Sequence, residues 1–140
     1  MTEYQFYALT TVILFFKMFA NSIVQGLGRL NARAFVTAED ARFFAQAPPV
    51  PDEAPIVKRA TMCWHNDIEN IPIFLFLGLI YITLGCWPEG VYIYFSIFIV
   101  ARILHTIAFL NGWQPWRTIF FTIGMFVCVT LSIQILTTVL

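Results

Sequence analysis

Charged side chains are scarce in this chain. Asp, Glu, Lys and Arg make up only 11% of its 140 residues, and the formal net charge is zero. Soluble globular proteins carry roughly 25% charged residues. A zero net charge also excludes the basic field that draws proteins to nucleic acid, so no nucleic-acid partner is expected. Three cysteines, Cys63, Cys86 and Cys128, form no CxxC pair and no metal-ligand spacing with the two histidines, which argues against a metal site and a disulfide.

Apolar residues dominate instead, at 59% of the chain, with 17% aromatic residues. They form long runs, each near the ~20 residues that a membrane-spanning helix requires. The pattern predicts a single all-α domain, an integral-membrane four-helix bundle in contact with the lipid bilayer. Its residues are 1–140, with helices at about 6–27, 58–84, 91–111 and 115–138 and a long polar loop at about 28–57.

The basic residues gather on one predicted side of the membrane. The predicted loop and the first two residues of the second helix carry five of them, which are Arg29, Arg33, Arg42, Lys58 and Arg59. Arg117 begins the last helix on the same side, and the opposite side has only Glu3 and Glu89. The positive-inside rule therefore predicts a multi-pass protein whose loop faces the cytoplasm. The compartment stays open: the endoplasmic reticulum or outer mitochondrial membrane in a eukaryote, or the inner membrane in a bacterium.

Two cations fall inside apolar runs. Lys17, with Asn21 four residues later, either turns toward neighbouring helices or extends to the membrane edge, and the sequence favours neither. Arg102 lies deep within its run and must be paired, with Asp67 or Glu69 as the partner. A structural ion-pair network accounts for Arg102 without any functional role.

A polar cluster at residues 65–70 adjoins the second apolar run, and the helical spacing places Asn66, Glu69 and Asn70 on one face. Polar groups beside hydrocarbon indicate a site. At the same membrane depth, Arg29 and the first turn of the last helix, with Arg117 and Thr118, offer cations and donors for an anion or a thiolate. A ligand that carries carboxylates, an amino group, amides and a thiol would fit these side chains. Glutathione carries all of these groups, and we expect it as the co-substrate.

Three segments carry a resemblance to a known family. They are Asn66-Asp67-Ile68-Glu69-Asn70-Ile71, the run from Ala101 to Leu110, and Gln114-Pro115-Trp116-Arg117, and the first loop adds Arg29-Leu30, Ala34-Phe35 and Glu39-Asp40. In order and spacing the chain resembles the MAPEG family, the membrane-associated proteins of eicosanoid and glutathione metabolism. It is most similar to the branch of microsomal glutathione transferases and prostaglandin E synthases.

The resemblance implies a homotrimer with glutathione at subunit interfaces near the cytoplasmic face. It assigns catalysis to Arg117, Thr118 and Asp40, with Arg117 stabilising the thiolate. A lipophilic second substrate would enter from the bilayer between the first and last helices, beside Phe120, Phe121, Met125 and residues 14–18. The glutathione-binding residues that it implies are Arg29, His65, Asn66, Glu69, His105, Phe109, Arg117 and Thr118.

The chain departs from its relatives at four positions. Met62 and His65 stand where the relatives have arginines, and Phe109 and Phe121 stand where they have tyrosines. The leading hypothesis is a glutathione transferase or peroxidase that activates the thiolate for attack on lipophilic electrophiles or lipid hydroperoxides. A glutathione-dependent prostaglandin-type isomerase, a non-catalytic lipid-binding or scaffold member of the family, and a small transporter or channel subunit are the alternatives.

Overall fold

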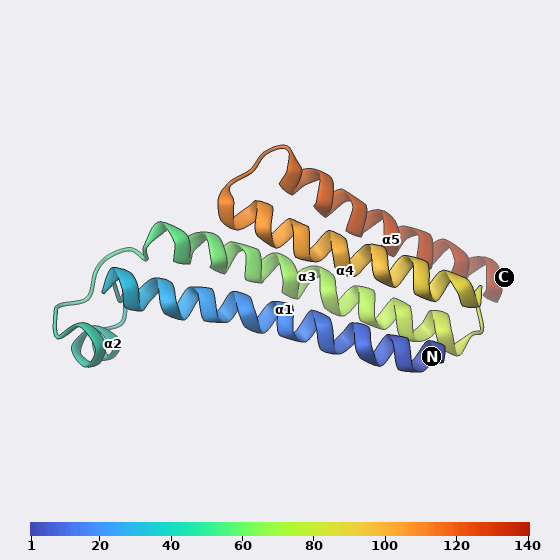
Figure 1. Ribbon diagram of the computed structural model, residues 1–140, viewed down its shortest axis with the longest axis horizontal. Helices are drawn as coiled ribbons and strands as arrows, with labels where there is room; N and C mark the ends of the chain where they lie inside the picture. The colour runs from blue at the N-terminus through green and yellow to red at the C-terminus, as the bar shows by residue number, and fades with distance from the viewer.

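The computed structural model describes residues 1–140 and contains only helices, which confirms the all-α prediction. Four long helices run side by side along the long axis of the molecule (Figure 1). Both chain termini lie at one end of the molecule, which we call the terminal end. The short helical segments between the first two long helices lie at the opposite end, which we call the loop end. The elements are α1 (Glu3–Ala32), α2 (Ala38–Asp40), the π-helix η1 (Ala41–Ala45), α3 (Pro55–Thr83), α4 (Pro88–Asn111) and α5 (Trp116–Val139).

Helix α1 is longer than the apolar run that predicts it. It begins at Glu3 because Thr2 and Gln5 form a capping box, in which Thr2 Oγ1 accepts from the Gln5 N–H at 3.2 Å and the Thr2 N–H donates to Gln5 Oε1 at 2.9 Å. It ends at Ala32, because the capping residue Arg33 has a left-handed backbone with φ of 48°. The helix therefore passes the predicted end at residue 27, and the connection to α3 is shorter than the predicted loop.

Prolines and a glycine define the other helix ends. Pro55 and Pro88 occupy the first turns of α3 and α4, where their missing N–H groups cost no hydrogen bond. Gly112 ends α4 with φ of 70°. A Cβ atom at this position would also lie 2.2 Å from Arg59 Nη1. The left-handed backbone therefore favours glycine here, whereas the flexible Arg59 side chain could move away from a Cβ atom.

The hydrophobic core is built around stacked aromatic rings from α3 and α4. The rings of Phe74 and Phe98 are parallel with centroids 3.7 Å apart, and Phe95 meets Phe74 edge-on at 5.1 Å. Gly78 allows this approach, because a Cβ atom there would lie 2.8 Å from Phe95 Cζ. Helix α1 packs mainly on α3, and α5 packs mainly on α4, so the two pairs enclose this aromatic centre.

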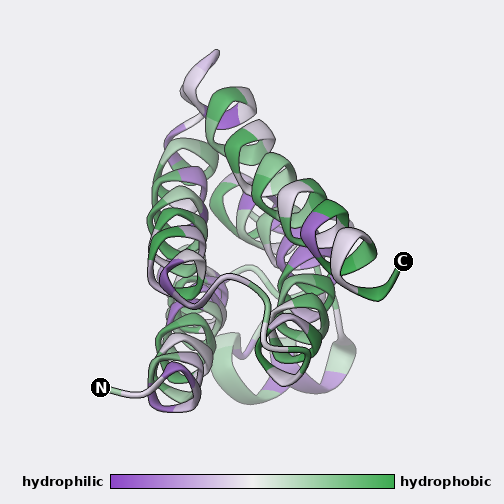
Figure 2. Cartoon of the chain, turned by 90° about the vertical axis from the view of Figure 1, so that its right-hand side faces the viewer, coloured by the Kyte–Doolittle hydropathy of each residue, from purple (hydrophilic) through white to green (hydrophobic).

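Helices α1, α4 and α5 are long and apolar enough to cross a membrane. At 30 residues, α1 extends about 45 Å and exceeds a hydrocarbon core of about 30 Å. Hydrophobic residues recur along the whole length of the long helices (Figure 2). Helix α3 is not among the three, because its first half carries Lys58, Arg59 and the polar cluster at 65–70.

Candidate functional site

A buried charge cluster joins α1, α3 and α4 toward the loop end. It consists of Lys17, Asp67 and Arg102. Arg102 Nη2 donates to Asp67 Oδ1 at 2.7 Å, and Lys17 Nζ donates to the other carboxylate oxygen, Oδ2. The exposed fractions of these side chains are 6% for Lys17, 0% for Asp67 and 1% for Arg102. The cluster therefore holds two positive charges against one negative charge.

The charge cluster decides between the alternatives for both intramembrane cations. Arg102 pairs with Asp67, as one of the two predictions states, whereas Glu69 is exposed on α3. Lys17 turns inward to Asp67 and does not extend to the membrane edge. Burying an ion costs several kcal/mol unless the ion is paired and hydrogen-bonded. The inward orientation of the Lys17 and Arg102 side chains is therefore favoured in a hydrocarbon environment.

Asn66 is oriented by the charge cluster. Arg102 Nη2 donates to Asn66 Oδ1 at 2.6 Å, and Asn70 Nδ2 donates to the backbone carbonyl of Asn66 at 2.6 Å. An asparagine side chain has one acceptor oxygen and two N–H donors. Because Arg102 holds the oxygen, the half-buried Asn66 presents its N–H donors to an acceptor on a ligand.

A second group of side chains gathers between α4 and α5, and we call it the α4–α5 group: His105, Phe109, Arg117 and Phe121. The His105 ring lies edge-on to Phe109 with centroids 5.6 Å apart and tilted against Phe121 at 6.2 Å. The guanidinium carbon of Arg117 lies 4.7 Å from the centre of the Phe109 ring, within cation–π distance. The tertiary structure thus brings three of the predicted glutathione-binding residues together.

Gln114 connects Arg117 to Thr118. In the amide orientation that satisfies both partners, Gln114 Oε1 accepts from Arg117 Nη2 at 3.1 Å and Nε at 3.2 Å, while Gln114 Nε2 lies 3.1 Å from Thr118 Oγ1. Arg117 and Thr118 lie in the first turn of α5, where free N–H groups favour an anion. The sequence analysis includes Gln114 in a family motif but gives it no role in the site, although its spacing of four residues from Thr118 is a signal for the contact.

Three buried polar atoms have no hydrogen-bond partner: Asn21 Oδ1, Arg102 Nε and His105 Nδ1. Arg102 belongs to the charge cluster, His105 belongs to the α4–α5 group, and Asn21 lies on α1 one turn from Lys17. A buried polar atom without a partner costs about 1–3 kcal/mol. These atoms therefore mark positions where an ordered water or a polar ligand group is favoured.

Other predicted residues lie apart from these two groups. Arg29 donates from Nε and Nη2 to Glu53 Oε1 at 2.9 and 2.6 Å, an ion pair that the sequence did not reveal because Glu53 lies in the aperiodic proline-rich connection. His65 and Glu69 are exposed on α3, and no hydrogen bond or ion pair joins their side chains to the α4–α5 group. One chain therefore presents the predicted binding residues in separate sets.

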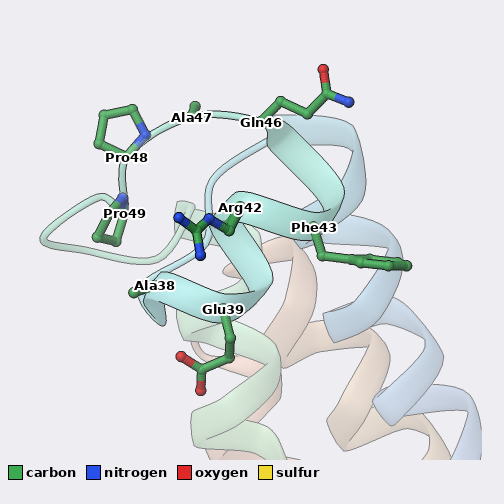
Figure 3. A pocket seen from close by; sticks show the side chains of 8 residues that line it. All are labelled: Ala38, Glu39, Arg42, Phe43, Gln46, Ala47, Pro48 and Pro49. Carbon is green, nitrogen blue, oxygen red and sulfur yellow. The ribbon is translucent and has the colours of Figure 1, made fainter.

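Asp40 ends α2 and is exposed without a side-chain partner. Glu39, the residue before it, lines a hollow of about 1190 Å³ between the short helices and the proline-rich connection (Figure 3). In this hollow Arg42 extends toward Pro48 and Pro49, and Phe43 points away from them (Figure 3). None of the predicted glutathione-binding residues lines it, and a catalytic role of Asp40 stays a prediction.

The stretch of α1 at residues 14–18, part of the predicted lipophilic slot, is only partly buried. Leu14 has no exposed surface and lies in the hydrophobic core, yet Leu14, Phe15 and Met18 also line a groove of about 430 Å³ beside α3, so this part of the slot stays a prediction. The helical spacing alone did not show which face of an all-apolar helix turns inward. Met125 on α5 is 40% exposed and stays a candidate.

Comparisons with known proteins identify the family of this chain. The model of the MAPEG family matches residues 7–137. Human prostaglandin E synthase is 34% identical over 131 residues, which cover 93% of this chain and 86% of that protein, and the rat protein of the same name is 33% identical over 131 residues, covering 93% and 85%. Human microsomal glutathione S-transferase 1 is 32% identical over 137 residues, covering 93% of this chain and 86% of the relative. Family model and relatives span nearly the whole chain, and the protein belongs to the MAPEG family.

Proposed function

We propose that this protein is a membrane-bound glutathione transferase or peroxidase that activates the glutathione thiolate for attack on lipophilic electrophiles or lipid hydroperoxides. The observation that carries the proposal is the position of Arg117 at the start of α5, against Phe109 and joined to Thr118 through Gln114. The relative named microsomal glutathione S-transferase 1 supports glutathione as the co-substrate.

The enzyme that we propose is an integral-membrane, multi-pass four-helix bundle that forms a homotrimer. The support comes from the separation of the binding residues. Within one chain, Arg29, His65 and Glu69 do not join the α4–α5 group. A neighbouring subunit that placed its α3 surface against this group would complete a site from two half-sites. The endoplasmic reticulum or outer mitochondrial membrane in a eukaryote, or the inner membrane in a bacterium, is the proposed location.

In this mechanism the protein ionises and positions the thiol. The guanidinium of Arg117 and the hydroxyl of Thr118 stabilise the negative sulfur, which makes it a strong nucleophile near neutral pH. In the transferase reaction a sulfur–carbon bond forms, and the leaving group departs with its electron pair. In the peroxidase reaction the sulfur attacks the O–O bond, the alkoxide takes a proton, and a second glutathione reduces the sulfenic product to give the disulfide and water.

The other residues would hold the rest of glutathione. Asn66 offers N–H donors to a carbonyl or carboxylate oxygen, and Glu69 accepts the ammonium group. His65 and His105 supply ring nitrogens, and the buried His105 Nδ1 has no partner in the chain. Arg29 is paired with Glu53 and binds a glutathione carboxylate either by exchanging this partner or through its remaining N–H donors.

An ultraviolet difference titration tests the proposal. Detergent-purified protein is titrated with glutathione at neutral pH, and the thiolate band is followed. We expect a saturable band in the wild type and in Arg42→Ala, a control for loss of an exposed arginine on η1, and no band in a folded Arg117→Ala variant. Absence of the band in wild type at millimolar glutathione would overturn the proposal and favour the non-catalytic lipid-binding interpretation.

A glutathione-dependent isomerase is the second candidate, and the relatives named prostaglandin E synthase favour it. The same thiolate would attack one oxygen of an endoperoxide, so that an S–O bond forms and the other oxygen leaves as an alkoxide, which takes up a proton to become a hydroxyl. Loss of the proton from the carbon that bears the S–O group would then form a carbonyl and break the S–O bond, so the glutathione thiolate is regenerated. Product analysis separates the candidates. An isomerase converts the lipid peroxide with no net loss of glutathione, whereas a transferase or peroxidase consumes one or two molecules for each turnover.

A further inference from the structure

A groove between α1 and α4 lies apart from the α4–α5 group. Its volume is about 420 Å³, which falls within the range of small-molecule sites, about 300–1,000 Å³. Seven of its ten lining residues are hydrophobic, among them Ile13 and Phe16 of α1 and Ile107 of α4. Phe16 and Ile107 are exposed on the outer surface of the long helices, so the groove opens toward the surrounding lipid.

The floor of the groove is polar, unlike its walls. Lys17, Asn21 and Thr106 line it, and Lys17 and Asn21 are almost completely buried. An ammonium group has three donors, and Asp67 accepts one of those of Lys17. Asn21 Nδ2 donates to the Ala60 carbonyl at 3.0 Å, but the Asn21 Oδ1 acceptor is buried without a partner. The floor therefore offers both a donor and an unused acceptor.

The charge of the floor favours an acidic group. The charge cluster contains two cations and one carboxylate, and Lys17 is the cation that lines the groove. An unbalanced positive charge in hydrocarbon is costly, and a negative charge placed against Lys17 would balance it. A carboxyl group also suits Asn21, whose Oδ1 accepts the acid proton when the group is protonated.

We propose that the groove between α1 and α4 binds a single-chain carboxylic acid, a fatty acid, with its carboxyl group at Lys17 and Asn21. Thr106 lies five residues before Asn111, where α4 ends, and Asn21 lies eleven residues before Ala32, where α1 ends, so the carboxyl group would sit roughly 8 Å inside the end of α4 and roughly 17 Å inside the end of α1. The acyl chain then runs past Ile13 and Phe16, along the apolar walls of the groove.

Equilibrium binding of labelled oleic acid and of oleyl alcohol to the protein in phosphatidylcholine nanodiscs tests this proposal. Glutathione is omitted, so the result does not depend on the proposed enzymatic function. We expect the acid to bind at least about tenfold more tightly than the alcohol, because a charge-assisted hydrogen bond is lost with the alcohol. Lys17→Met should remove this difference, and Lys58→Met, at an exposed lysine outside the groove, should preserve it.

A second variant tests the groove without touching its charges. Ile107→Trp fills the space between α1 and α4, and we expect it to weaken binding of the acid and of the alcohol alike. Equal affinity of the wild type for acid and alcohol would overturn the proposal. An unchanged affinity for the acid in Ile107→Trp would also overturn it. Absence of binding of either ligand would overturn it too, and would indicate that phospholipid or a second copy of the chain closes the groove.

Discussion

The two ends of this molecule join their helices through different polar networks. At the terminal end, the Tyr81 hydroxyl donates to Gln134 Oε1, and Gln134 Nε2 donates to the Tyr94 hydroxyl at 2.7 Å, so neutral groups tie α3, α5 and α4 together. Toward the loop end, the charge cluster ties α1, α3 and α4 through ions. Both networks lie between helices that are otherwise packed through apolar side chains.

The difference lies in what each network leaves unpaired. In the neutral network each buried polar atom has a partner, whereas the three buried polar atoms without one lie in or beside the charge cluster and the α4–α5 group. A fully paired network holds helices in register and needs nothing more. A network with surplus positive charge and free donors or acceptors is suited to a ligand. We therefore regard the terminal end as structural and the loop end as functional.

Asp67→Asn should have the largest effect. It leaves the two cations of the charge cluster facing each other without a counter-charge, so we expect the protein to lose about 3–5 kcal/mol of stability. Thermal unfolding in detergent, monitored by size-exclusion chromatography, measures this loss of stability. Glu69→Gln, at an exposed carboxylate of the same helix, is the matched control, and equal stability of the two variants would contradict the role of the charge cluster.

Arg117→Lys tests the other half of the loop end. Lysine keeps the positive charge but lacks the planar guanidinium that stacks on Phe109 and meets Gln114. We expect kcat/KM for glutathione conjugation to fall about tenfold, against roughly 100-fold for Arg117→Ala. Wild-type activity in both variants would show that the thiolate is stabilised elsewhere.

Tyr94→Phe tests the terminal end. The substitution leaves Gln134 Nε2 without its acceptor, and we expect a loss of about 1 kcal/mol in stability. Because this network lies at the opposite end from the α4–α5 group, KM for glutathione should not change. A clear change in KM would break the distinction between a structural and a functional end.

Lys17→Met should have the smallest effect on stability. It leaves Asp67 and Arg102 as a pair of balanced charges and replaces a buried ammonium with an apolar side chain of similar length. We expect a change below about 1 kcal/mol, of either sign, by the same unfolding assay as for Asp67→Asn. A loss as large as that of Asp67→Asn would show that both cations are needed to balance the carboxylate.

The sequence predicts many of the residues in the candidate site, but it does not predict which side chains pair with one another. The helical spacing and the apolar surroundings of Arg102 required an acidic partner, and Asp67 was one of two choices. The pairing of Arg29 with Glu53 and the bridge through Gln114 were not foreseen. Both depend on the path of an aperiodic connection, which has no hydrophobic repeat from which its direction can be predicted.

Composition and periodicity by themselves determined that this chain is all-helical and apolar enough for membrane-spanning helices, and the motif at residues 66–71 indicated the family. Only the tertiary structure decided that Lys17 turns inward to Asp67 and that Leu14 lies in the core. The physical reason is that an apolar helix in lipid has no solvent-facing side. Its rotation is therefore set by contacts with neighbouring helices, which are made between residues far apart in the sequence.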